Sequence, residues 1–151
     1  LITSSAASDV YKRQLLSDIG WAEHPDYRAL HSFIRILRLP IAGITHHERV
    51  LLALTVFVRY DGRRDQYEVN QVRSLLTEQE LQTAATIGVS LRLAHVISGG
   101  VPGLLSRTSL GFSEGGISLD LTSDRQLFSS SAVESIVRNL AKEIGVSYTI
   151  R

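Results

Sequence analysis

The sequence predicts a mainly α-helical protein with a small α+β tail, and three observations predict this fold class. Hydrophobic residues make up 44% and charged residues 21% of the 151 residues, which is the composition of a globular domain. From residue 15 to about residue 98 apolar residues recur at helical spacing, and beyond residue 103 they alternate every second residue. We therefore expect a helical domain over residues 15–105, followed over 106–151 by a β-hairpin, a helix and a final strand.

The first complete helix is predicted to begin at Pro25, because the missing N–H of proline costs nothing at a first helical position. Tyr27 and Phe33 fall on its apolar face, and Pro40 ends it. Trp21, just ahead of this helix, is expected to be a packing anchor.

Two capping boxes mark the starts of the next long helices. Thr45 with Glu48 opens a helix that runs to about Tyr60 and is apolar on nearly every side, so we expect it to lie in the middle of the domain. Thr77 with Glu80 opens the other, which runs to about residue 97 and ends at a pair of glycines.

The small residues of this last helix predict a close approach to another helix. They are Ala84, Ala85, Gly88 and Ala94.

The tail reads as strand, strand, helix, strand. Leu110 and Phe112 alternate with polar residues, and so do Ile117 and Leu119, with glycines between the two runs. A helix with one apolar face follows over 131–144, and alternation returns at 146–150. We expect a three-stranded sheet with one covering helix.

Residues 4–14, SSAASDVYKRQ, match codon for codon the translation of a transposase sequencing adapter. We therefore expect residues 1–14 to be a non-native, disordered segment, and the natural chain to begin near Leu15, inside a gene. The chain has 16 basic and 15 acidic residues. Removing Lys12, Arg13 and Asp9 leaves 16 − 2 = 14 basic and 15 − 1 = 14 acidic residues.

Composition excludes several classes of site. The chain has no cysteine, so it forms no disulfide and no thiolate metal site. Its net charge of +1 gives no overall field for nucleic acid or a membrane surface. No apolar run is long enough to span a bilayer and no signal-peptide pattern occurs, so we expect a cytoplasmic protein.

One cluster suggests metal or catalytic chemistry. Ser17, Asp18, His24 and His31 fall on neighbouring helical segments, and histidines with a carboxylate are what a divalent-metal phosphohydrolase uses.

Several short segments together resemble the C-terminal region of the exopolyphosphatase/guanosine pentaphosphate phosphohydrolase (Ppx/GppA) family, over residues 15 to about 121. They are Leu16-Ser17-Asp18-Ile19-Gly20, His24-Pro25-Asp26-Tyr27, His31-Ser32, Leu52-Ala53-Leu54, Val58-Arg59-Tyr60, Leu91-Arg92-Leu93-Ala94-His95, Pro102-Gly103-Leu104-Leu105 and Arg107-Thr108. The resemblance implies an HD-domain-like helical bundle, a separate N-terminal domain that holds the catalytic carboxylate and phosphate loops, and magnesium in the whole enzyme.

An active HD site needs a His-Asp dyad, and here the dyad position reads Ser17-Asp18. A hydroxyl is a poor replacement for imidazole as a metal ligand. We therefore expect Ser17, Asp18, His24 and His31 to be a degenerate site that binds no metal, and the chain itself to contain no catalytic residue.

Five arginines are candidates for binding a polyphosphate substrate, because the planar guanidinium can hold phosphate oxygens with two hydrogen bonds. They are Arg59, Arg63, Arg64, Arg92 and Arg107. The alternative is that they are solvated, or paired with carboxylates such as Asp61 and Asp65.

The sequence thus favours an accessory C-terminal domain that holds substrate for a separate catalytic domain, with a homodimer as a possible assembly. The substrate is polyphosphate or guanosine pentaphosphate, and the chain alone is expected to be inactive. Two alternatives stay open: an active HD-type metal-dependent nucleotide phosphohydrolase, and an interaction module without affinity for phosphate.

Overall fold

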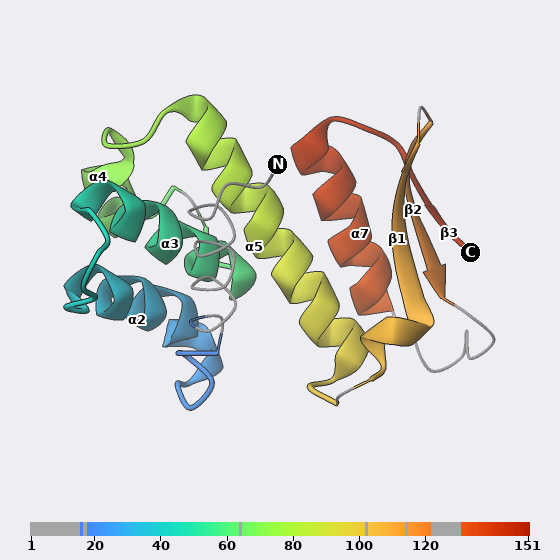
Figure 1. Ribbon diagram of the computed structural model, residues 1–151, viewed down its shortest axis with the longest axis horizontal. Helices are drawn as coiled ribbons and strands as arrows, with labels where there is room; N and C mark the ends of the chain where they lie inside the picture. The colour runs from blue at the N-terminus through green and yellow to red at the C-terminus, as the bar shows by residue number, and fades with distance from the viewer. Residues whose placement is uncertain (1–15, 17, 64, 102, 114, 122–130) are drawn as a thin grey trace. The chain divides into compact units, whose positions relative to one another are not determined.

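The computed structural model describes residues 16, 18–63, 65–101, 103–113, 115–121 and 131–151 (Figure 1). The segment 1–14, which the sequence attributes to an adapter, lies outside the described residues. The elements follow in the order α2 (Pro25–Arg38), α3 (His46–Arg59), α4 (Tyr67–Arg73), α5 (Glu78–Ser98), the 3-10 turn η1 (Leu105–Arg107), β1 (Thr108–Ser113), β2 (Gly116–Leu121), α7 (Ser131–Ile144) and β3 (Tyr148–Ile150). The predicted class, mainly α with a small α+β tail, is confirmed.

The chain forms two compact units. The first ends at Gly88 and contains α2, α3, α4 and the first half of α5, whereas the second begins at Val89 and contains the sheet and α7. The division between residues 105 and 106 rests on the change of periodicity in the sequence and stays a prediction. In the described part of the chain, no helix combines the length and the apolar character needed to cross a membrane.

The core of the first unit is built on α3. The capping box at its start is confirmed: the Glu48 N–H donates to Thr45 Oγ1 at 3.2 Å, and the Thr45 N–H donates to Glu48 Oε2 at 2.6 Å. Nine consecutive or near-consecutive positions of α3 are buried, as the apolar residues on all its sides predict. Phe57 meets Phe33 of α2 with ring centroids 5.4 Å apart. This contact joins α2 to α3.

Helix α5 begins at the second predicted capping box. The Thr77 N–H donates to Glu80 Oε2 at 2.8 Å, and the Glu80 N–H donates to Thr77 Oγ1 at 3.3 Å. The same carboxylate lies 2.7 Å from His47 Nε2, in the first turn of α3. Glu80 therefore joins the start of α5 to the start of α3.

Replacing Glu80 with glutamine should change how stability depends on pH. The Thr77 N–H, then the Thr77 hydroxyl, and then the charge of His47 hold the pKa of the Glu80 carboxyl below its ordinary value. A depressed pKa means that the unfolded chain binds the proton more readily, so the carboxylate stabilises the fold at neutral pH and this contribution is lost as the pH falls through the folded pKa.

The difference in melting temperature between the parent chain and Glu80→Gln should therefore shrink as the pH falls from neutral into the acid range. Glu68→Gln, in the first turn of α4, is the matched control. A difference that stays constant with pH would show that Glu80 does not act through its charge.

The second unit contains a three-stranded sheet in the order β1-β2-β3. Strands β1 and β2 form the predicted antiparallel hairpin, and β3 pairs parallel to β2 after the α7 crossover. Helix α7 packs on β2 and β3 through Val133, Ile136, Val137, Leu140 and Ala141, which are buried. The predicted sheet with one covering helix is confirmed (Figure 1).

Some expected core positions are exposed. Phe112 and Leu110 lie opposite the buried Ile117 and Leu119, on the same face of the sheet, yet Phe112 is 70% exposed because it lies on the edge strand, beyond the strands that α7 covers. Trp21 is 71% exposed, so the prediction that it is a packing anchor is wrong.

Candidate functional site

Asp18, the remaining member of the expected dyad, pairs with an arginine. Arg59 Nη2, at the end of α3, donates to Asp18 Oδ1 at 2.8 Å. The Arg59 side chain is 6% exposed and that of Asp18 is 67% exposed. The guanidinium also lies over the Tyr60 ring, 4.4 Å from its centroid, in a cation–π contact. Arg59, a polyphosphate candidate in the sequence, is therefore an internal residue whose charge is matched by Asp18.

Hydrogen bonds near this ion pair hold the segment 18–23 to α2 and to the end of α3. The Gly20 N–H donates to Tyr60 Oη at 3.2 Å, and Arg28 donates through Nε and Nη2 to the Glu23 carbonyl at 3.2 and 3.1 Å. Burial raises the pKa of the Tyr60 hydroxyl, which keeps it neutral. Position 20 favours glycine, because an added Cβ would clash with Ser32 Oγ and crowd the side chains of Arg28 and Tyr60.

Removing the charge of Asp18, the exposed member of its ion pair with Arg59, should destabilise the fold. Asp18→Asn leaves a buried guanidinium without its counter-charge, and we expect a loss of about 1 to 2 kcal/mol. Arg59→Met removes the charge but keeps much of the apolar stem, so the double variant should cost no more than Arg59→Met alone.

Chemical denaturation of the three variants measures these losses. Asp65→Asn removes the carboxylate from the exposed Arg63 pair and should leave the stability nearly unchanged. Additive losses in the double variant would contradict a direct interaction between the two residues.

His24 and His31 lie on either side of Tyr27, with ring centroids 5.8 Å from that of the tyrosine. His24 caps α2, because its Nδ1 accepts the Asp26 N–H at 3.3 Å. His31 Nδ1 lies 2.9 Å from Glu23 Oε2. Within the ranges that the structure describes, no three His, Asp or Glu side chains are grouped so that they could hold a metal ion.

The other predicted site residues are distributed over both units. Ser17 and Arg64 lie outside the described residues. Arg63 is in the exposed turn after α3 and donates two hydrogen bonds to Asp65, of 3.2 and 2.7 Å, which hold the pKa of the Asp65 carboxyl below its usual value. The Asp65 carboxylate therefore offsets the positive charge that Arg63 could offer to an anionic ligand.

Arg92 and Arg107 belong to the second unit, on α5 and η1. Both side chains are engaged in interactions of their own. They stay candidates, in a different unit of the chain from Arg59 and Arg63.

The sequence analysis missed a basic face on α2. Arg28, His31, Arg35 and Arg38 follow one another at steps of three, four and three residues, which places them on one side of the helix, away from Phe33. We call these four residues the α2 basic face. The signal was in the sequence, since basic residues recurred at helical spacing inside a helix that was correctly predicted.

The carboxylates of the described residues leave most of this charge unmatched. Arg28 donates to a backbone carbonyl, and Arg35 Nη1 does the same to the Ile19 carbonyl at 3.2 Å. Glu23 is the acidic partner of His31. The Arg38 side chain makes neither a hydrogen bond nor an ion pair with the described residues. The face therefore has three guanidinium groups and one carboxylate beside it.

An open groove of about 490 Å³ runs along the C-terminal half of this face. We call it the α2 groove, and its lining residues are Glu23, His31, Ile34, Arg35, Arg38, Leu39 and Pro40. Two arginines line it against one glutamate, so the groove suits an anion.

A family model described as exopolyphosphatase, C-terminal, matches residues 6–149. The match includes both the helical unit and the α+β tail, and it begins within the segment that the sequence attributes to an adapter, an attribution that stays a prediction. No curated protein matches the chain. Because the family model covers nearly all of the sequence, the chain belongs to the exopolyphosphatase C-terminal domain family.

Proposed function

We propose that this chain is the accessory domain of an exopolyphosphatase and that it holds the polyphosphate chain along the α2 basic face. The observation that carries the proposal is the set of guanidinium groups on one side of α2 whose charge is matched by no carboxylate among the described residues. The unmatched charge is what a polyanion requires.

The geometry of the face suits a linear anion. From Arg28 to Arg38 the helix rises about 15 Å, at 1.5 Å per residue. A helix is straight over this length, so its cationic side chains form a row and not a cluster. Each guanidinium group can hold the oxygens of one phosphate through two parallel hydrogen bonds. The negative charges of polyphosphate repeat along its chain. A row of cations therefore meets several phosphates of one chain.

The arginines of this face also have structural roles, which do not compete with binding. Arg35 and Arg38 lie in the last turn of α2, where a cation stabilises the helix dipole. Arg28 and Arg35 hold backbone carbonyls of the segment 18–23. A carbonyl accepts a hydrogen bond without cancelling the charge of the guanidinium, so the field of the face remains available to an anion.

In this proposal the chemistry belongs to an N-terminal catalytic domain. That domain would supply the catalytic carboxylate, the phosphate loops and the site for magnesium. Asp18 and Asp65 do not suit magnesium, because each carboxylate is paired with an arginine, Arg59 and Arg63. This chain alone is then expected to release no orthophosphate from polyphosphate in the presence of magnesium. Release that is lost in Asp18→Asn would favour the HD-type enzyme.

A titration of the chain with long polyphosphate at low salt tests the binding. Arg35→Gln and Arg38→Gln should each weaken the affinity roughly fivefold to tenfold, since each removes one charge-assisted contact. Arg138→Gln, whose side chain pairs with Glu134 on α7, is the matched control and should change nothing. Arg92→Gln and Arg107→Gln extend the series to the second unit.

Two outcomes would contradict the proposal. In the first, neither α2 variant differs from the parent chain while polyphosphate still binds, which would move the site to Arg92 and Arg107. In the second, polyphosphate does not bind at low salt at all, which would favour the interaction module without phosphate affinity.

A further inference from the structure

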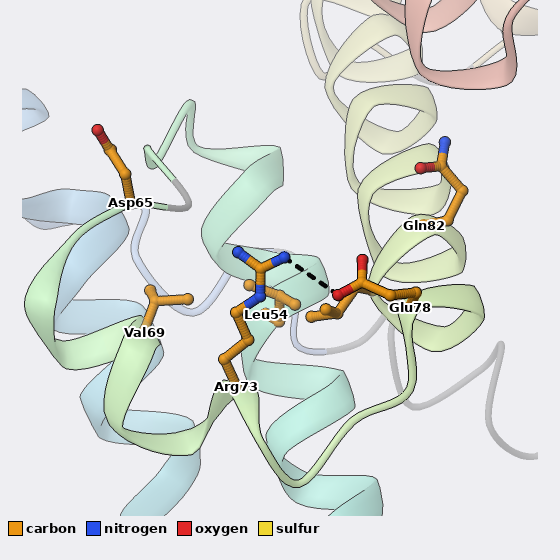
Figure 2. A pocket seen from close by; sticks show the side chains of 7 residues that line it. Leu54, Asp65, Val69, Arg73, Glu78 and Gln82 are labelled. Atoms are coloured by element: carbon orange, nitrogen blue, oxygen red, sulfur yellow. Dashed lines mark hydrogen bonds and ion pairs between the residues drawn. The ribbon is translucent and has the colours of Figure 1, made fainter.

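A second hollow in the first unit lies between α3, α4 and the start of α5 and encloses about 290 Å³ (Figure 2). It shares no lining residue with the α2 groove. The residues that line it are Leu54, Asp65, Val69, Arg73, Glu78, Leu81 and Gln82. We call it the α4 pocket. Its volume is at the lower limit for small-molecule sites, so it suits a small ligand.

The floor of the α4 pocket is apolar. Leu54, Val69 and Leu81 come from three different helices and are nearly fully buried. Apolar side chains that converge from separate elements exclude water from the bottom of the pocket, and they favour a compact apolar group over a hydrated ion.

The rim is charged, and one of its ion pairs is weak. Arg73 Nη2 lies 3.2 Å from Glu78 Oε1, which is longer than the 2.7–2.9 Å typical of a charge-assisted hydrogen bond. The Glu78 side chain is 85% exposed. In Figure 2 the two side chains reach toward each other across the pocket, with Leu54 behind them. An exposed pair of this kind contributes little to stability, so Glu78 is easily displaced.

The other carboxylate of the rim is already occupied. Asp65 accepts two hydrogen bonds from Arg63, and Figure 2 shows its carboxylate pointing away from Arg73. Arg73 is therefore the charged group that a ligand in the pocket can engage. Within the residues that the structure describes, Glu78 is the one hydrogen-bonding partner of its guanidinium.

We propose that the α4 pocket binds a small anion with a compact apolar body, such as an aryl carboxylate or an aryl monophosphate. The apolar body lies on Leu54, Val69 and Leu81, and the anionic head takes the place of the Glu78 carboxylate on Arg73. Glu78 swings into solvent, where it is already mostly exposed. This site is separate from the proposed polyphosphate face and does not depend on it.

Titrations of the 151-residue chain with benzoate and with phenyl phosphate, followed by amide NMR shifts, test the site. We expect saturable shifts at the residues around the pocket. Phenol lacks the charge and orthophosphate lacks the apolar body, so each should bind at least tenfold more weakly than phenyl phosphate. Comparing benzoate with phenyl phosphate decides which head group the pocket prefers.

Variants distinguish binding in this pocket from the binding of anions elsewhere on the chain. Arg73→Gln should weaken phenyl phosphate binding at least tenfold, whereas Glu78→Gln should strengthen it about threefold, because it removes the competing charge. The double variant Arg35→Gln/Arg38→Gln, in the α2 groove, should leave it unchanged, as should Arg138→Gln. Melting temperatures near that of the parent chain would show that the variants are folded.

The proposal is overturned if Arg73→Gln binds phenyl phosphate as well as the parent chain does. It is also overturned if Glu78→Gln weakens the binding, or if the shifts map to α2 and vanish in Arg35→Gln/Arg38→Gln. In that last case the aryl anions would bind at the α2 basic face. The polyphosphate proposal would then be supported and the α4 pocket proposal rejected.

Discussion

Gly88→Ala is expected to lower the free energy of unfolding by about 2 kcal/mol, although alanine is the better helix former. At Gly88 the backbone of α5 lies close against α3. An added Cβ would lie 2.6 Å from the Thr55 carbonyl oxygen and 2.8 Å from Val58 Cβ. A backbone oxygen cannot turn aside, so the helices must separate, at a cost of about 3 kcal/mol against about 1 kcal/mol gained in helix propensity.

Urea denaturation measures this loss. Gly43→Ala is the comparison: its φ of +77° makes a side chain strained, but the space around it is empty, so the cost should be about 1 to 2 kcal/mol from backbone conformation alone. A Gly88→Ala chain as stable as the parent, or more stable, would mean that α5 does not approach α3 at this position.

Reversing the charge of two arginines in the α2 groove should have the largest effect on binding. In Arg35→Glu/Arg38→Glu the affinity for long polyphosphate should fall by more than about a hundredfold, because two attractive charges become repulsive and fewer counterions are released. The affinity of the parent chain should fall steeply with salt. That of the variant should depend on salt less, because fewer cationic groups contact the polyanion.

A variant with the same change in net charge elsewhere controls for the overall field. Arg63→Glu/Arg138→Glu alters two exposed arginines that pair with Asp65 and Glu134. Titrations at several salt concentrations compare the two double variants. If both lose the same affinity, net charge and not the α2 face governs binding.

The elements of the fold could be predicted because their signals are local. A capping box involves residues three apart, and Pro25 and the glycines after α5 act on their own backbone, so Thr45, Thr77 and Gly99 mark the helix ends correctly. The hairpin follows from alternation in the same way.

The candidate site depends on contacts between residues far apart in the sequence. Nothing local indicates that Arg59 meets Asp18, so a buried partner of the degenerate dyad was taken for a ligand-binding arginine. The burial of single side chains could not be predicted for the same reason. Trp21 and Phe112 are apolar, but tertiary packing decides whether another element covers them. The α2 basic face could be predicted from the sequence, because it needs only helical spacing, but its three arginines lie outside the family-like segments.

Amide NMR of the labelled chain, titrated with long polyphosphate at low salt, tests the central claim most directly. If the α2 basic face holds the anion, the largest shifts appear from His31 to Leu39. They also appear in the segment 18–23, whose carbonyls and Glu23 carboxylate are bound by Arg28, Arg35 and His31. Shifts confined to the surroundings of Arg92 and Arg107, with none in α2, would contradict the claim.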